Sequence, residues 1–482
     1  MGNQQKVMTN WRWMMCAMLF FATTVNYMDR QVLSLTFKEF IQPEFHWTDS
    51  DYGTITGVFS IAYAIFCLFA GKFIDWMGTK KGYLIAIIVW SFGAVLHAAC
   101  GWGTSLIEGF ASVEAMRAVE AGSTAALGVA ATSVWLFLAC RMILGLGEAG
   151  NFPAAIKVTA EYFPKKDRAF ATSIFNAGAS VGALAAPATI PLLAKAWGWE
   201  MAFIIIGALG FIWAAVWVFV YDKPAESKHV NHAELAYINQ DEELSALNQP
   251  VAEEKQMSYL QALSYKQTWS FAFGKFMTDG VWWFFLFWAP AYFQDQFGHK
   301  ASDPMGIALI FTLYAIVTVL SLFGGYLPKI FVEKKGMDPY AGRMRAMLIF
   351  AFFPLLALFA QPLGDHFHSA WWPAIIIGLV GAGHQSWSAN IFSTVGDMFP
   401  KSAIATITGI GAMAGGLGSF LINKGSGVLF DYAAGQGDAF SFMGFTGKPA
   451  GYMIVFCICA VAYLIGWSVM KALVPKYKKV EF

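Results

Sequence analysis

The sequence predicts an all-α membrane protein in which twelve transmembrane helices form two halves of six helices each. Three observations predict this fold class. Hydrophobic residues make up 57% of the 482-residue chain, whereas charged residues make up only 13%. About twelve apolar segments are each close to the ~20 residues that an α-helix needs to cross a bilayer. One polar segment, residues 222–266, separates the first six of these apolar segments from the last six.

Each apolar segment is expected to form one membrane-spanning helix. The predicted spans are residues 12–34, 52–73, 82–100, 128–152, 169–190, 200–221, 268–293, 305–328, 344–361, 371–398, 404–430 and 450–472. Most connections are short, but residues 101–127 form a longer loop in which we expect a short surface helix.

The distribution of positive charge predicts the orientation. Lysines and arginines concentrate in the loops after the second, fourth and eighth spans and at the C-terminus. Because cytoplasmic loops carry an excess of these residues, both termini and the central linker are predicted to be cytoplasmic. The predicted domains are an N-terminal half at 1–221, a cytoplasmic linker at 222–266 and a C-terminal half at 267–482.

The composition argues against several classes of function. The formal net charge is +1, which gives no electrostatic support for binding nucleic acid. The six cysteines lie in or beside apolar segments and have no histidine partners at metal-ligand spacing, so no metal site is expected. The linker carries no nucleotide-binding motif and no nucleophile signature, which argues against an enzyme, and no cofactor is expected. The glycine-rich stretch 411–418 is expected to let helices pack closely.

The strongest functional signal is a pair of opposite charges inside the apolar segment 128–152. Arg141 and Glu148 are seven residues apart, about two helical turns, so they lie on one face of a helix. A charge at membrane depth costs several kcal/mol, and such residues usually face a wet cavity or each other on a transport pathway. In the first span, Asp29 and Arg30 are adjacent and point about 100° apart, so one can face a cavity while the other reaches a neighbouring helix. The alternative is a buried ion pair that only holds helices together.

Polar side chains also occur in the other apolar segments. Lys275 and Asp279 lie four residues apart on one face of the seventh span, where they either neutralise each other or leave Lys275 available to an anion. Aromatic and amide side chains suit the rings and hydroxyls of sugars, although packing is the alternative for several of them. The candidates of this kind are Tyr27, Tyr63, Asn176, Trp283, Gln385, Trp387 and Asn390.

The loop after the second span carries a family signature. It reads GKFIDWMGTKK from residue 71 to residue 81, where Gly71 is expected to allow close contact between helices and Gly78 a tight turn. Its Gly71, Asp75, Gly78, Lys80 and Lys81 match the pattern Gly-x-x-x-Asp-x-x-Gly-x-Lys/Arg-Lys/Arg of the major facilitator superfamily, at the position between the second and third helices where that family has it. The chain therefore resembles this superfamily, and the resemblance implies that the loop takes part in gating.

Further segments narrow the resemblance. Residues 26–30 and 141–148 look like the organic anion:proton symporter branch, and residues 275–285 and 383–390 are similar to bacterial hexuronate transporters. This resemblance implies two six-helix halves around a central cavity, a bacterial inner (cytoplasmic) membrane and alternating access, and the protein is expected to act as a monomer. It implies import of a sugar-acid monoanion, a hexuronate such as galacturonate or glucuronate, together with protons.

The roles of the charged residues follow as hypotheses. Arg30 and Lys275 are expected to hold the substrate carboxylate from opposite halves, because a midplane site forms where the halves meet. Asp29 and Glu148 are expected to carry protons, and Arg141 is expected to set the protonation state of Glu148. Arg141 is also a candidate substrate-binding residue. Two alternatives remain: an aldonate or aldarate carrier of the same branch, and a sugar-acid sensor that keeps the fold without transport.

Overall fold

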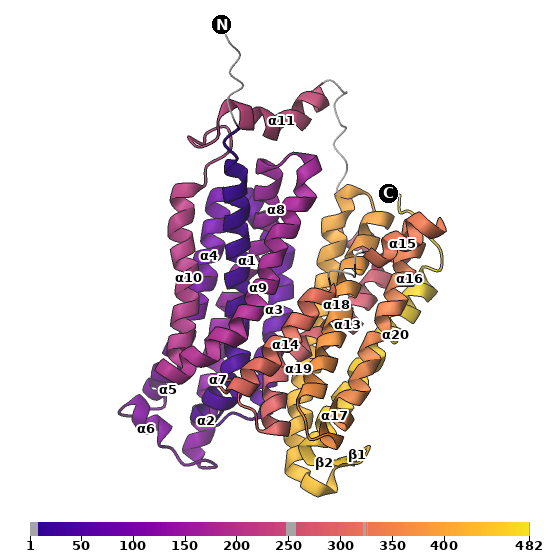
Figure 1. Cartoon of the computed structure of the whole chain (residues 1–482). Helices are drawn as coiled ribbons and strands as arrows, with labels where there is room; N and C mark the ends of the chain where they lie inside the picture. The colour runs from indigo at the N-terminus through magenta and orange to yellow at the C-terminus, as the bar shows by residue number, and fades with distance from the viewer. Residues whose placement is uncertain (1–7, 247–256, 322–323, 325, 482) are drawn as a thin grey trace.

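The computed structural model describes residues 8–246, 257–321, 324 and 326–481, and almost all of them are helical (Figure 1). The helices that run through the body of the molecule are α1 Trp11–Thr36, α3 Asp49–Met77, α4 Thr79–Leu96 with α5 Cys100–Ile107, α7 Thr124–Glu148 with α8 Asn151–Tyr162, α9 Lys165–Trp197, α10 Trp199–Val220, α13 Lys266–Phe297, α14 Pro304–Ser321 with α15 Tyr326–Lys335, α16 Pro339–Ala351 with α17 Ala357–His366, α18 Trp371–Met398, α19 Lys401–Gln436 and α20 Gly447–Leu473. The shorter elements are the π-helix η1 Phe37–Ile41, α2 Gln42–Phe45, α6 Val113–Arg117, α11 His232–Ala246, α12 Tyr259–Ala262, the 3₁₀ turns η2 His97–Ala99, η3 Phe353–Leu356 and η4 Gly437–Ala439, and a hairpin of β1 Ser441–Phe442 and β2 Phe445–Thr446.

Within the described residues, nine helical stretches are long and apolar enough to cross a membrane. The chain is therefore a multi-pass membrane protein. Helices α1, α13 and α18 are not among the nine, although they are 26, 32 and 28 residues long. These three helices interrupt their apolar sequence with polar and charged residues, which return below as residues of the candidate site.

The helices form two groups that lie side by side (Figure 1). Helices α1–α10 make up one group, α13–α20 make up the other, and α3 and α19 pack together between them. Glycines allow this close approach: a Cβ on Gly53 would lie 2.6 Å from the carbonyl oxygen of Asn423, and one on Gly416 would lie 2.4 Å from the Cβ of Ala64. The prediction of close packing at 411–418 is confirmed, since a Cβ on Gly418 would also meet the Phe276 carbonyl oxygen.

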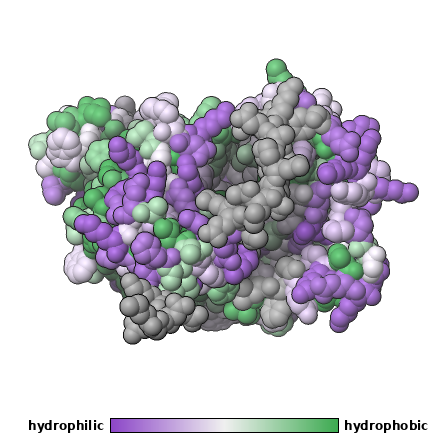
Figure 2. Space-filling model, turned by 90° about the horizontal axis from the view of Figure 1, so that it is seen from above, coloured by the Kyte–Doolittle hydropathy of each residue, from purple (hydrophilic) through white to green (hydrophobic). Residues whose placement is uncertain are grey.

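At the upper end of the view, α11 covers the start of α1 (Figure 1). The buried carboxylate of Glu234 accepts hydrogen bonds from the backbone nitrogens of Trp11 (2.9 Å) and Arg12 (3.0 Å) and from the hydroxyl of Thr9 (2.6 Å). It also forms an ion pair with the Arg12 guanidinium at 3.1 Å. Because the first amides of a helix have no partners within it, Glu234 caps α1 from the linker. Figure 2 looks onto this end and shows hydrophilic residues over large parts of it.

The signature loop joins α3 to α4 at the same end. Gly78 has φ 77° and ψ 156°, a conformation that glycine adopts without a steric penalty, so the predicted tight turn is confirmed. The expected close contact at Gly71 is wrong in this structure, because a Cβ there would meet nothing within 4 Å.

The charged residues of the signature loop contact neighbouring segments of their own group and the start of the linker. Asp75 pairs with Lys157 of α8 at 2.7 Å, and Lys80 pairs with Asp222 at 2.8 Å. Lys81 is exposed. These contacts hold the ends of α3, α4 and α8 together.

The predicted surface helix in the long loop is confirmed as α6. Arg117 at its end pairs with Glu44 of α2 at 3.0 Å and also contacts Glu200. The indole nitrogen of Trp199 donates to Glu44 at 2.7 Å. Burial nevertheless raises the pKa of Glu44. The loop is thus fastened to the lower end of the bundle.

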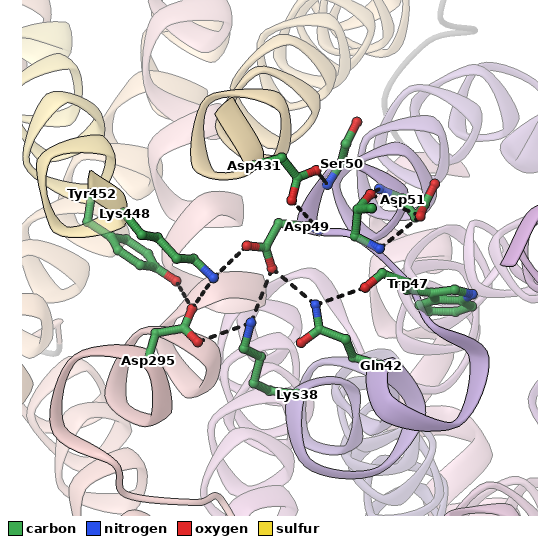
Figure 3. A network of polar contacts seen from close by, with 11 residues as sticks. Lys38, Gln42, Trp47, Asp49, Ser50, Asp51, Asp295, Asp431, Lys448 and Tyr452 are labelled. Atoms are coloured by element: carbon green, nitrogen blue, oxygen red, sulfur yellow. Dashed lines mark hydrogen bonds and ion pairs between the residues drawn. The ribbon is translucent and has the colours of Figure 1, made fainter. Parts of the chain in front are cut away.

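A network of charges joins the two groups at this lower end (Figure 3). Lys38 of η1 lies 3.3 Å from Asp49 of α3 and 3.0 Å from Asp295 of α13. Lys448 of α20 lies 2.5 Å from each of the same two carboxylates. Asp431 of α19 accepts hydrogen bonds from the first backbone nitrogens of α3, including that of Asp49 at 2.9 Å. Among the described residues, every ion pair between the two groups lies at this end.

We expect Asp49→Asn to loosen the lower end, because this carboxylate contacts both lysines of the network. Spin labels on exposed residues of the two groups, Ala115 and Gln436, should then report longer distances than in the parent chain. Asp303→Asn is the matched control. It removes an exposed pair between the groups, with Lys195 at 3.7 Å, and exposed pairs contribute only about 0–1 kcal/mol. Equal distances in the Asp49 variant and the control would contradict the assigned role of the network.

Candidate functional site

A cavity of about 250 Å³ lies between the two groups of helices. Five helices line it: α1, α3, α13, α18 and α19. Six of the residues predicted from the sequence are on its wall: Tyr27, Arg30, Tyr63, Lys275, Trp283 and Gln385. Ligand pockets usually combine apolar walls with a few placed polar groups, and this cavity has that composition.

The centre of the site is an ion pair between α1 and α7. Arg30 donates from Nε (3.1 Å) and Nη2 (2.9 Å) to one carboxylate oxygen of Glu148. Both side chains are almost fully buried. Aromatic rings surround the guanidinium: its carbon lies 4.7 Å from the ring centre of Tyr63, 5.2 Å from Trp283 and 5.3 Å from Tyr27. Such cation–π contacts stabilise a partly desolvated cation, and Trp283 extends the enclosure to the other group of helices.

The expected ion pair between Arg141 and Glu148 is not formed in the structure. Glu148 pairs with Arg30 instead, while the Arg141 guanidinium lies over the ring of Phe59 at 5.3 Å. Arg141 is buried, does not line the cavity, and its Nη1 has no hydrogen-bond partner within the described part of the chain. The seven-residue spacing does place both residues on one helix face, but Arg30 comes closer to the carboxylate than Arg141 does.

Asp29 lies behind this pair. It is buried, and neither of its oxygens finds a hydrogen-bond partner among the residues that the structure describes. Its charge is within electrostatic reach of Glu148 and Arg141. Arg30 lines the cavity and Asp29 does not, as expected for adjacent residues on a helix. A buried carboxylate without partners is costly as an anion, and this environment suits a group that carries a proton.

On the opposite wall, α13 contributes a second pair of charges. Lys275 and Asp279 both line the cavity, and the lysine nitrogen lies 2.7 Å from a carboxylate oxygen. The same nitrogen lies 4.3 Å from the ring centre of Phe392. Of the two outcomes that the sequence left open, the structure shows the one in which these charges neutralise each other.

Helix α18 presents only some of its predicted residues to the cavity. Gln385 is on the wall, but Trp387 is fully buried with its ring edge-on to Tyr463. Asn390 donates to the backbone oxygens of Gly324 (3.3 Å) and Ser386 (2.8 Å) and does not line the cavity. Positions 387 and 390 lie about 160° and 140° around the helix from position 385, which explains why they face the protein.

His384 fits a structural interpretation. Its Nδ1 lies 2.6 Å from the hydroxyl of Tyr463, and that hydroxyl donates to the backbone oxygen of Thr278 at 3.2 Å. The imidazole also stacks on Trp282 with a centroid distance of 5.5 Å and an interplanar angle of 4°. These contacts hold α13, α18 and α20 together at the edge of the cavity.

A second cavity of about 210 Å³ adjoins the first, since Tyr27 and Gln385 line both. Asn176 and Ser180 of α9 lie on its wall, as their shared helix face predicts. The polar lining therefore extends from the Arg30 site towards α9 and α14.

Some wall residues were not identified from the sequence. The large apolar ones are Trp282, Leu286 and Phe392, and the small or weakly polar ones are Ser60, Ala64, Cys67, Ser388, Ala412, Gly415 and Gly416. Helical spacing contained the signal for several of them. Positions 60 and 67 fall three before and four after Tyr63, and position 388 falls three after Gln385, so they share faces with recognised residues.

The sequence is similar to those of bacterial proteins named as sugar-acid transporters. The hexuronate transporter of Escherichia coli K12 is 28% identical over 469 residues, which cover 95% of this chain and 94% of that protein. The probable galactarate/D-glucarate transporter of Bacillus subtilis 168 is 26% identical over 406 residues, covering 83% of this chain and 82% of that protein.

The fold has solved counterparts. A bacterial homologue of the human lysosomal transporter Spinster, in an inward-facing and occupied conformation, superposes with a TM-score of 0.67 at 18% identity, covering 96% of this chain and 97% of the other. At that identity the likeness concerns the fold alone. The sequence profile of the Major Facilitator Superfamily matches residues 19–422. This chain therefore belongs to the Major Facilitator Superfamily and is a membrane transporter, not an enzyme.

Proposed function

We propose that this transporter imports a sugar-acid monoanion, a hexuronate such as galacturonate or glucuronate, together with protons. The observation that carries the proposal is Arg30, a cation on the cavity wall that is enclosed by aromatic rings and held by a buried carboxylate. An arginine suits a carboxylate because its donors match two oxygens. The names of the relatives, which include hexuronate and galacturonate transporters, support the substrate class.

The proposal includes the membrane topology, the orientation and the oligomeric state of the protein. Together with the nine apolar stretches, α1, α13 and α18 make twelve membrane-spanning helices, in halves at 1–221 and 267–482 joined by the linker 222–266. Both termini face the cytoplasm of a bacterial cell, and the protein works as a monomer by alternating access. Tyr27, Tyr63, Asn176 and Gln385 bind the sugar hydroxyls, and Trp283 covers the ring.

Proton coupling follows from the geometry of the ion pair. Two donors of Arg30 are held by Glu148, so a substrate carboxylate must compete with a carboxylate of the protein. A proton on Glu148 removes that competitor and frees the guanidinium for the substrate. Asp29, which lies buried beside the pair, provides a second protonatable carboxylate. We therefore propose that more than one proton accompanies each anion.

The substrate is tested by uptake into proteoliposomes across a panel of galacturonate, glucuronate, gluconate and galactonate. We expect a uronate to be taken up best. Preferred uptake of gluconate or galactonate would favour the aldonate alternative. Substrate binding without counterflow would show that the protein is a sensor and not a carrier.

Arg30→Ala should abolish substrate binding at any pH. Losing one member of a buried charge pair costs about 2–5 kcal/mol, which corresponds to a loss of affinity of about thirtyfold or more. Arg30→Lys should not restore full affinity, since lysine lacks the planar set of donors. The matched control is Arg141→Gln, which removes a buried arginine that does not line the cavity. This variant should largely keep its affinity, and near-normal binding by Arg30→Ala would exclude Arg30 as the carboxylate ligand.

The variants Glu148→Gln and Asp29→Asn should retain exchange of substrate for substrate while losing accumulation driven by a proton gradient. Each neutral side chain mimics the protonated acid, so the substrate can bind, but the proton of that carboxylate is no longer exchanged during the transport cycle. Exchange is measured as counterflow in proteoliposomes, and accumulation as uptake under an imposed pH gradient. A variant that still accumulates substrate would identify its carboxylate as structural.

The stoichiometry predicts a dependence on membrane potential. One proton per monoanion is electroneutral, so only the pH gradient, about 1.4 kcal/mol per pH unit, would drive uptake. A second proton adds a net positive charge, to which the potential contributes about 2.3 kcal/mol per 100 mV. We expect uptake under an inside-negative potential without a pH gradient. Uptake that ignores the potential would mean one proton per anion.

A further inference from the structure

The charges of the cavity are arranged in two pairs, one from each group of helices. Arg30 pairs with Glu148 in the first group, and Lys275 pairs with Asp279 in the second. Each cation that could bind a carboxylate of the substrate is therefore already occupied by a carboxylate of the protein. With all four groups ionised, the two pairs together have no net charge.

The two cations lie at different depths of the cavity. The Arg30 guanidinium lies against Trp283, eight residues beyond Lys275 along α13. The Lys275 ammonium reaches Asp279, one turn along α13, and the four residues from Asp279 to Trp283 correspond to about 6 Å along the axis. If the first carboxylate of a substrate lies at Arg30, Lys275 is therefore placed to contact the opposite end of that molecule. It is less well placed to bind the first carboxylate itself.

Neighbouring atoms hold Asp279 against Lys275. On α19, Gly415 packs so closely that a Cβ there would lie 2.2 Å from the paired oxygen of Asp279. On the other side, the Lys275 nitrogen rests over the ring of Phe392. Both charged side chains are largely buried, with 7% of Lys275 and 13% of Asp279 exposed. The pair is therefore held in place by packing, unlike a flexible pair on a surface.

We propose that Asp279 restricts the substrate to a single carboxylate. It occupies the position on Lys275 that the second carboxylate of a six-carbon dicarboxylic sugar acid would take. This inference rests on the proposed function, in which Arg30 binds the first carboxylate. A dianion would place its second charge beside Asp279, where like charges repel, whereas the uncharged end of a uronate meets a neutral pair and can donate a hydroxyl hydrogen bond to it. Selectivity of this kind arises from a group that disfavours the wrong ligand.

The test measures competition in proteoliposomes that exchange labelled galacturonate. Unlabelled glucuronate, a monoanion, and galactarate, a dianion, compete with the label, and the ratio of their half-inhibitory concentrations is the readout. In the parent chain galactarate should compete poorly. In Asp279→Asn the freed Lys275 becomes a second carboxylate site, and the ratio should shift towards galactarate by at least tenfold. Asp279→Ser, which also removes the carboxylate, serves if the asparagine variant does not fold.

The double variant Lys275→Met/Asp279→Asn separates two explanations. It removes both charges and keeps the pair's net charge at zero, so it should not gain affinity for galactarate. An equal gain in the double variant would overturn the assignment, because the effect would not involve Lys275. An unchanged ratio in both single variants at Asp279 would also overturn it. If the parent chain exchanges none of the monocarboxylic sugar acids, the proposed function itself fails. This outcome differs from the two outcomes above, which concern Asp279 alone.

Discussion

The buried ion pair of Arg30 and Glu148 is the interaction on which the rest of the site depends. Burying two charges costs several kcal/mol for each ion, and their attraction offsets this cost only with good geometry and further partners. Arg30 meets that condition through two hydrogen bonds to one carboxylate oxygen and through three aromatic rings. One of these rings, Trp283, belongs to the other group of helices. The pair is thus sensitive to how the two groups meet.

Helices α1, α13 and α18 are polar because they carry the residues of the site. These long helices are not apolar enough to count among the nine clear membrane-spanning stretches. They carry Arg30, Lys275 and Gln385, which line the cavity. A charged side chain facing lipid would be costly, but one facing a cavity inside the bundle finds partners there. Three of the five helices that line the cavity are therefore less apolar than the nine stretches, to which the other two, α3 and α19, belong.

The sequence was sufficient for the helices and for much of the cavity wall, because apolar length and helical spacing are local properties. It predicted that Tyr27 and Arg30 of α1 belong to the site and that the stretch 411–418 allows close packing, but it was wrong about Gly71. It did not predict that Glu148 pairs with Arg30 and not with Arg141, since that choice depends on the rotation and distance of helices far apart in the chain. The same limit applies to α18, where Trp387 and Asn390 suit a sugar chemically, yet the helix turns them towards Tyr463 and Gly324.

The charges at the lower end suggest how the two groups could separate reversibly, as the proposed alternating access requires. Lys38 and Asp49 belong to one group, and Lys448 and Asp295 belong to the other. Separation breaks two ion pairs of the network, Lys38–Asp295 and Lys448–Asp49, and the hydrogen bonds from the first amides of α3 to Asp431. It leaves each lysine beside a carboxylate of its own group. An ordinary buried ion pair would expose two uncompensated charges on opening, with a large penalty while water is still excluded. Here both lysines keep a carboxylate of their own group, so these pairs can stabilise closure without making opening prohibitive.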